Sequence, residues 1–153
     1  MIIIHTMDTE LLPRWVTDSL QRRLRVMPVV IVTGARQTGK STLVRQLTPG
    51  KRRYYSLDDL DVVDLARRDP EALVGGQRAR ARDEVQREPE LLHAVKRAVD
   101  RQPQAGRFLL TGSANLLLMR RVSESLAGRA SYLSLWPMTR REQLGSGRCG
   151  IWD

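Results

Sequence analysis

Two patterns of hydrophobic and polar positions alternate along the chain. Short continuous apolar runs, at 29–32 and again at 108–110, are typical of strands buried on both faces of a parallel sheet. Weaker runs at 54–57 and 132–135 predict two further strands. Between the runs, apolar residues recur at the spacing of an amphipathic helix. We expect helices over residues 11–24, 41–47, 60–66 and 116–126, and one more that Pro89 opens.

The helix after Pro89 has the clearest apolar stripe, and its apolar residues are of the kind that fill a core. Strands that alternate with helices in this way favour an α/β layered fold with a mostly parallel sheet. The residues on the stripe are Leu91, Leu92, Val95, Ala98 and Val99.

A glycine-rich motif lies between the first buried strand and the helix that follows it. In such a loop the glycines let the backbone amides converge on an anion, and the start of the helix adds partial positive charge. Lys40 would reach the β- and γ-phosphates, the Ser41 hydroxyl would bind Mg²⁺, and Thr42 would lie near the α-phosphate. The motif, a full match to the phosphate-binding pattern G-x-x-x-x-G-K-[ST], is Gly34-Ala35-Arg36-Gln37-Thr38-Gly39-Lys40-Ser41.

An ATPase with this loop also needs an acidic pair at the end of a neighbouring strand, and the candidates are Asp83 for Mg²⁺ and Glu84 for the attacking water. The residues before them alternate arginine and alanine, where a buried parallel strand should be apolar. Burying Arg80 and Arg82 without partners would cost several kcal/mol each. We therefore expect a strand that is displaced, solvated or salt-bridged, and an acidic surface turn remains the alternative for Asp83 and Glu84.

Five segments together resemble the AAA+ superfamily ATPases that carry an ATP-binding domain of the AAA_14 type. The resemblance covers most of residues 12–144, with the segments in the expected order. It implies a P-loop NTPase fold, a three-layer α/β/α sandwich with a mostly parallel sheet, and binding of ATP with Mg²⁺. The segments are residues 30–42, 55–59, 83–86, 109–115 and 123–129.

The resemblance also implies roles for residues outside the loop. Ser113 and Asn115 are similar to the polar sensor that reads the γ-phosphate, with a helix-capping turn as the alternative. Arg129 is similar to an arginine that serves the phosphate site of its own or a neighbouring subunit. By analogy, the strand before the phosphate loop should lie at the centre of the sheet, flanked by the strand that carries the sensor.

The chain departs from the family pattern in two respects. The arginine-alanine run before Asp83 puts Mg²⁺ placement and hydrolysis in question, so we expect weak or absent hydrolysis. Family members also continue into a second, mostly helical region, whereas this sequence reads as an ATPase domain over 1–144 and a glycine-rich tail over 145–153. We therefore expect exposed apolar surface that supports self-association or binds a protein partner.

Composition adds a second hypothesis about function. The 153 residues carry a net charge of +9, and nearly all of the 26 basic residues are arginine, which would attract nucleic acid. These arginines are scattered along the chain and few aromatic residues lie among them, so a nucleic-acid-binding module is the alternative to an ATPase. A lone Cys149 excludes a disulfide framework, and no apolar run approaches the length of a membrane span, so we expect a cytoplasmic protein.

Overall fold

The structure, a computed structural model, describes residues 12–47, 53–76, 80–113, 124 and 126–145. The strands are β1 (Val29–Gly34), β2 (Arg53–Ser56), β3 (Arg80–Asp83), β4 (Phe108–Ser113) and β5 (Ala130–Ser134). The helices are α1 (Thr17–Val26), α2 (Lys40–Leu47), α3 (Leu60–Arg68), α4 (Pro70–Val74), α5 (Glu90–Arg101), α7 (Arg140–Gln143) and the 3₁₀ turn η1 (Val85–Arg87).

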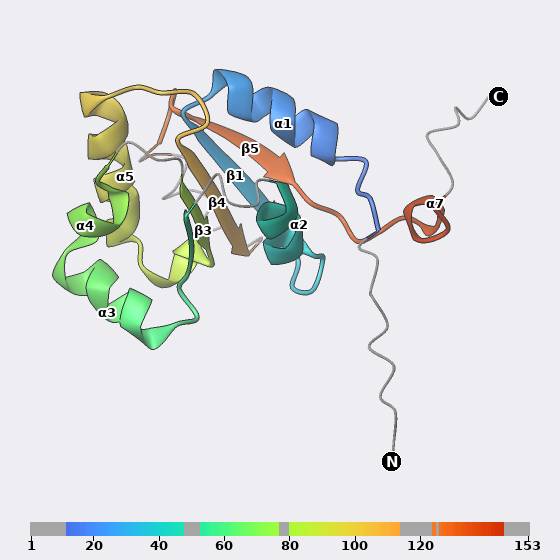
Figure 1. Ribbon diagram of the computed structural model, residues 1–153, viewed down its shortest axis with the longest axis horizontal. Helices are drawn as coiled ribbons and strands as arrows, with labels where there is room; N and C mark the ends of the chain where they lie inside the picture. Colours follow the sequence, from blue (N-terminus) through green and yellow to red (C-terminus); the bar gives the residue numbers. More distant parts are fainter. Residues whose placement is uncertain (1–11, 48–52, 77–79, 114–123, 125, 146–153) are drawn as a thin grey trace, which may run out of the picture.

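The strands form one sheet in the order β2-β3-β4-β1-β5, and all of its neighbouring strands pair in parallel (Figure 1). The expectation that the strand before the phosphate loop lies at the centre is wrong, because β4 occupies the middle of the sheet. β1 lies next to it, between β4 and β5, so the sensor strand does flank β1 as expected. Since all strands point the same way, their carboxyl ends meet at one edge.

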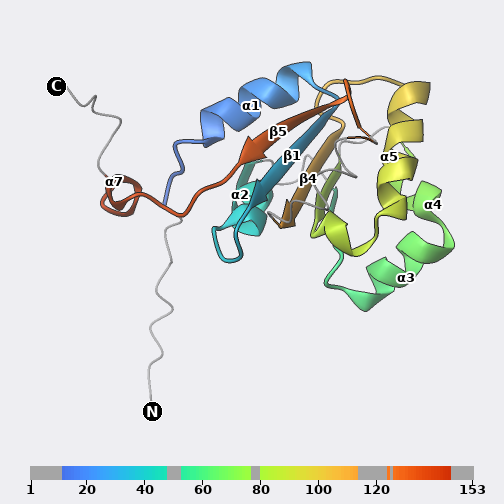
Figure 2. The same ribbon diagram turned by 180° about the vertical axis from the view of Figure 1, so that it is seen from behind.

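Helices cover both faces of this sheet, which gives the three-layer α/β/α sandwich that the family resemblance implies. α1 and α2 lie on one face, and α3, α4 and α5 lie on the other (Figures 1 and 2). β1 is buried on both sides because its side chains alternate between the two layers: Val30 and Val32 pack with α1 and α2, whereas Val29 and Ile31 pack toward α5.

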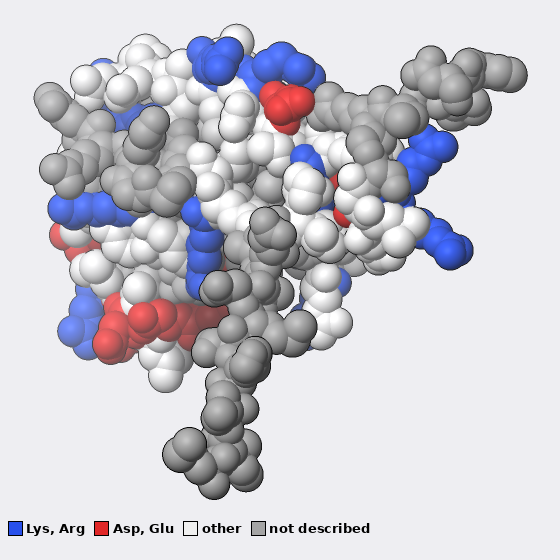
Figure 3. All heavy atoms as spheres, turned by 45° about the vertical axis from the view of Figure 1, so that its right-hand side comes forward, with Lys and Arg blue, Asp and Glu red and all other residues white. Residues whose placement is uncertain are grey.

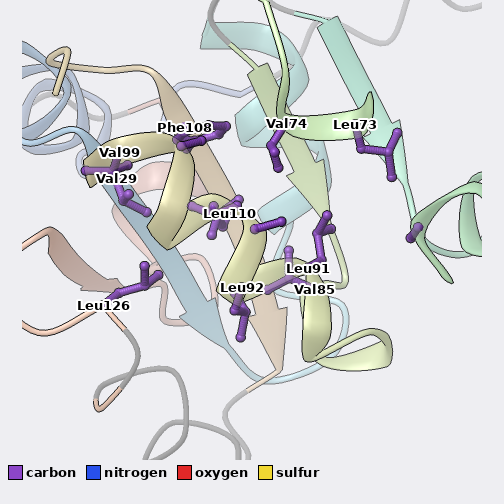
Figure 4. Packing of buried hydrophobic residues seen from close by; sticks show 14 of the residues in the cluster. Val29, Leu73, Val74, Val85, Leu91, Leu92, Val99, Phe108, Leu110 and Leu126 are labelled. Carbon is purple, nitrogen blue, oxygen red and sulfur yellow. The ribbon is translucent and has the colours of Figure 1, made fainter. Parts of the chain in front are cut away.

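The larger apolar cluster lies between the sheet and α5. Figure 4 shows Leu92 and Val99 of α5 facing the side of the sheet that carries Val29, Phe108 and Leu110. All of these side chains are buried, and the stripe predicted after Pro89 is therefore core. Burial of one such side chain contributes about 1.5–3 kcal/mol to stability, so this layer holds α5 against the sheet.

The strand before the acidic pair lies inside the sheet rather than displaced from it. β3 pairs in parallel with both β2 and β4, and its last residue, Asp83, is only 3% exposed. The expectation of a displaced strand is therefore wrong for the backbone. The ladder is made by main-chain amides and carbonyls, so polar side chains on β3 do not prevent its hydrogen bonds.

Other expectations differ in their boundaries. The first helix begins at Thr17 instead of residue 11, because the side chain of Arg14 and the amide of Trp15 are bound to residues that follow β5. The expected helix over 116–126 lies almost entirely outside the described residues. Among the helices that the structure describes, none has the length and apolarity needed to cross a bilayer.

Candidate functional site

The glycine-rich loop follows the carboxyl end of β1 and leads into α2 (Figure 1). Both glycines at its ends are required by the backbone. A Cβ at Gly34 would lie 2.3 Å from the carbonyl oxygen of Leu135, so a side chain there would displace main chain. Gly39 has a φ of +86°, a left-handed conformation that glycine adopts without steric cost. The loop is thus closely packed against the segment that follows β5.

The amides of this loop are available to bind an anion. Within the described part of the chain, no backbone carbonyl accepts a hydrogen bond from the amides of residues 35–42. The amides at the start of α2 have no partner inside the helix, and the helix dipole places partial positive charge there. Loop and helix together form a concave row of donors, which is the arrangement that holds phosphate.

Lys40 places a buried positive charge in the same loop. Its side chain is 5% exposed, and Nζ donates to the carbonyl oxygens of Ala35 at 2.8 Å and Gly34 at 3.2 Å. Thr38 Oγ1 also donates to the Ala35 carbonyl, at 3.0 Å. No ion pair joins Lys40 to a carboxylate among the residues described. A buried ammonium with only neutral partners favours a bound anion.

Asp83 lies beside this loop as a buried and ionised carboxylate. Its oxygens accept hydrogen bonds from the hydroxyls of Thr111, of Ser41 and of Tyr54, the last at 2.6 Å. Burial by itself would raise the pKa of Asp83, but the hydrogen bonds from Ser41, Thr111 and Tyr54, with the positive charge of Arg45, lower it below the ordinary value. Ser41 and Asp83, predicted to share a Mg²⁺ ion, are therefore in contact.

Tyr54 is a site residue that the sequence reasoning missed. Burial, together with the hydrogen bond and negative charge of Asp83, raises the pKa of Tyr54 to about 12, although Arg45 lowers it in part. The guanidinium of Arg45 on α2 lies 4.5 Å from the centre of the Tyr54 ring. The register of β2 with β3, in which Ser56 is opposite Asp83, could have placed this side chain, but only once the strand order was known.

Glu84 follows Asp83 in a left-handed conformation, with φ of 57°, and its amide donates to Thr111 Oγ1 at 3.1 Å. Such a conformation is uncommon for a residue other than glycine and is enriched at functional sites. Glu84 borders a cavity of about 380 Å³ whose other lining residues all belong to the phosphate loop or to the start of α2. Those residues are Arg36, Gln37, Gly39, Lys40, Ser41 and Thr42.

A second cavity, of about 520 Å³, also borders the loop. Gln37, Gly39 and Thr42 contribute to both cavities, while Leu12, Arg14 and Met138 line only this one of the two. Its volume falls in the range of small-molecule sites, and apolar side chains from segments before α1 and after β5 form part of its wall. No sequence pattern indicates this cavity, because the segments that form its walls are distant in the chain.

The remaining predicted residues are placed differently. Ser113 ends β4 and is opposite Gly34 in the register, so it lies at the same edge of the sheet as the loop. Arg129 lies at the other edge, before β5, where its Nε is 2.5 Å from Asp100 Oδ1. The structure therefore does not bring Arg129 to the phosphate loop of its own chain. Asn115 lies outside the described residues.

Some of the excess arginine forms ion pairs at the protein surface. Arg67 pairs with Glu88 at 2.8 Å, and Arg97 and Arg101 both bind Glu71. On the face seen in Figure 3, basic side chains appear at several separate places rather than in one continuous patch. The nucleic-acid hypothesis thus has no supporting geometry on that face and stays a prediction.

Comparisons with known proteins show a matching family and related sequences. The family model described as an AAA domain (AAA_14) matches residues 26–144. The uncharacterized proteins Rv2008c of Mycobacterium tuberculosis and Mb2031c of Mycobacterium bovis are each 39% identical to the chain over 135 residues, or 87% of it. The chain spans 30% of the length of these relatives.

A similar fold is present in the crystal structure of a DNA replication initiation factor. That structure matches 85% of this chain and 46% of its own, with a TM-score of 0.56 and 13% sequence identity. At so low an identity the likeness shows the fold alone.

Proposed function

The chain belongs to the AAA domain family, as a P-loop ATPase-like domain, and from that premise we propose that it binds ATP together with Mg²⁺ at residues 34–42. The observation that carries the proposal is the buried ammonium of Lys40. It lies within a row of backbone amides that donate no hydrogen bond to any described backbone carbonyl. The triphosphate would lie in the cavity bordered by Lys40 and Glu84, and the base in the larger cavity beside Arg14.

The residues at the loop also fit a magnesium ion. Ser41 and Asp83 offer a hydroxyl and an ionised carboxylate that already contact each other. No cluster of three or more acidic, histidine or cysteine ligands occurs in the part of the chain that the structure describes, so phosphate oxygens and water would complete the shell. When bound, Mg²⁺ neutralises phosphate charge and orients the transferred group.

For hydrolysis we propose that Glu84 polarises the attacking water, because it borders the same cavity as Lys40. Lys40 would offset the charge that develops on the phosphate, and Asn115 with Ser113 would orient the water. Arg129 would act only in the site of a neighbouring subunit, since it lies at the opposite edge of the sheet. Because β3 is rich in arginine, we still expect the rate of ATP hydrolysis to be low.

We also propose a protein partner or self-association for the exposed apolar side chains near α7. Trp136 is 76% exposed and Leu144 is 69% exposed, and both lie beside the segment that packs on the phosphate loop. Large apolar side chains in water favour association. Whether a partner binds there would be tested by sedimentation of the wild type against Trp136→Ser.

A thermal melt tests nucleotide binding directly. Mg·ATP at about 100 times its Kd should raise stability by roughly 2.7 kcal/mol. Lys40→Ala should remove most of this gain, and Arg23→Lys, in the last turn of α1 and bonded to β5, serves as the matched control. A wild-type melting temperature that millimolar nucleotide leaves unchanged would overturn the proposal.

A further inference from the structure

Arg14 lies outside the phosphate-loop motif, yet its guanidinium contacts the loop directly. Its Nη1 donates to the carbonyl oxygen of Thr38 at 2.8 Å, and a Cβ at Gly39 would lie 3.4 Å from the same nitrogen. The Nη2 donates to the carbonyl oxygen of Trp136 at 2.6 Å. The Arg14 side chain is 8% exposed, so these are contacts of a buried cation rather than of a surface side chain.

The contact with Thr38 constrains the peptide that joins Thr38 to Gly39. In a trans peptide the carbonyl and the following amide point in opposite directions. A guanidinium that holds the Thr38 oxygen on the Arg14 side therefore turns the Gly39 amide away from Arg14. Gly39 lines both cavities, and the smaller one, which Lys40 and Glu84 also line, is not bordered by Arg14. Its left-handed φ of +86° accommodates this orientation.

Glu142 holds the guanidinium in place. Its Oε1 lies 3.3 Å from Arg14 Nε and accepts the Trp15 amide at 2.9 Å, while Oε2 accepts the Thr139 amide at 2.8 Å. The Glu142 side chain is 6% exposed and closes the capping box at the start of α7. A buried ion pair with further hydrogen bonds has one favoured geometry, so Arg14 is fixed before any ligand arrives.

We propose that Arg14 is a positioning residue for phosphate binding: it orients the Thr38–Gly39 peptide so that the Gly39 amide faces the anion, and Glu142 fixes Arg14 for this task. The inference rests on the proposed function, since it assumes that the loop binds phosphate. It also links the loop to the segment from Trp136 to Glu142, and Arg14 is itself 122 residues from Trp136 in sequence.

The test uses inorganic tripolyphosphate, which has no base and so does not depend on the larger cavity. Its Kd is measured by isothermal titration calorimetry for the wild type and for Arg14→Lys, which keeps the charge but loses the planar fork. We expect roughly 10-fold weaker binding, the effect of one lost charge-assisted hydrogen bond. Glu142→Gln should give a smaller loss, because the fork remains.

Arg23→Lys is the matched control. Arg23 also joins an N-terminal element to β5, through Ser131 Oγ at 2.5 Å and the Tyr132 carbonyl at 3.2 Å, but it does not touch the loop. It should lower the melting temperature without changing the Kd of tripolyphosphate. If Arg14→Lys behaves in the same way, Arg14 is merely structural and the proposal is overturned.

A measurement on the wild type covers the case in which Arg14→Lys does not fold. In ¹H–¹⁵N NMR spectra the Gly39 amide proton should move downfield when tripolyphosphate is added, as it gains an anionic acceptor. An unmoved Gly39 signal with saturated binding would overturn the proposal. Failure of the wild type to bind tripolyphosphate at all would instead overturn the proposed function. Lys40→Ala serves as the non-binding reference for that measurement.

Discussion

Removing the hydroxyl of Tyr54 tests how Asp83 is held at the site. In Tyr54→Phe the ring stays on β2 beside Arg45, and only the hydrogen bond of 2.6 Å to Asp83 Oδ2 is lost. The substitution therefore separates the hydrogen bond from the packing. Tyr55→Phe is the matched control, because Tyr55 is next in sequence and packs in the cluster on the opposite face of the sheet.

The size of the effect follows from the partners that Asp83 keeps. A hydrogen bond to a charged group contributes about 1.5–3 kcal/mol. Ser41 and Thr111 continue to donate hydrogen bonds to Asp83, so the carboxylate keeps two of its donors. Tyr54 is only partly buried, and water can replace part of the lost bond. We therefore expect the free energy of unfolding to fall by about 1.5 kcal/mol, at the low end of that range.

The pH dependence gives the prediction a second signature. The folded pKa of Asp83 is lowered, so its stabilisation is present above the unfolded pKa of about 4 and is lost as pH falls through the folded value. The pKa of Tyr54 is raised to about 12, so its stabilisation is present below the unfolded value of about 10 and is lost as pH rises toward 12. The penalty of Tyr54→Phe should thus be largest near neutral pH and shrink at both extremes.

Urea unfolding followed by circular dichroism measures this penalty, with an unchanged m-value as the sign that the compactness of the two states is preserved. Absorbance near 295 nm follows tyrosine ionisation, and the fraction that titrates near pH 12 should be absent from Tyr54→Phe. A variant as stable as the wild type at pH 7, or one that keeps the late-titrating fraction, would refute the reasoning.

Three further predictions follow from the same geometry. Glu84→Gln should leave the Kd of ATP unchanged and abolish phosphate release in a coupled assay; unchanged turnover would exclude Glu84 as the residue that polarises water. Gly34→Ala should lower the free energy of unfolding by about 1–3 kcal/mol, because its Cβ would meet the Leu135 carbonyl, and urea titration would expose the error if stability were retained. The lowered pKa values of Asp83 and Glu142 predict stability that is full above about pH 4.5 and declines as pH falls, and a flat acid limb in pH-dependent melts would contradict this.

The local parts of the fold could be predicted from the sequence. The apolar, β-branched run at 29–32 predicts the buried strand β1, and the apolar stripe around Leu91 and Val95 predicts the buried face of α5. The glycine pattern predicts the position of the phosphate loop. Burial on both faces was also enough to identify β4. These features depend on neighbours in the chain, so a pattern along the sequence carries them.

The rest of the site depends on contacts between distant segments. The sequence around β3 argued against a buried strand, yet main-chain pairing with β2 and β4 holds Asp83 at the edge of the sheet. Tyr54 reaches Asp83 across 29 residues, and Arg14 reaches Glu142 across 128. No periodicity encodes such pairs. The order of the strands, with β4 in the middle of the sheet, also could not be determined from the spacing of the motifs.

Titration of ATP into the purified chain by calorimetry, with and without Mg²⁺, tests the central claim most directly. We expect one site per chain, tighter binding with Mg²⁺ than without it, and no detectable heat of binding for Lys40→Ala. Equal heats for the wild type and Lys40→Ala, or no binding by the wild type at millimolar nucleotide, would contradict the account.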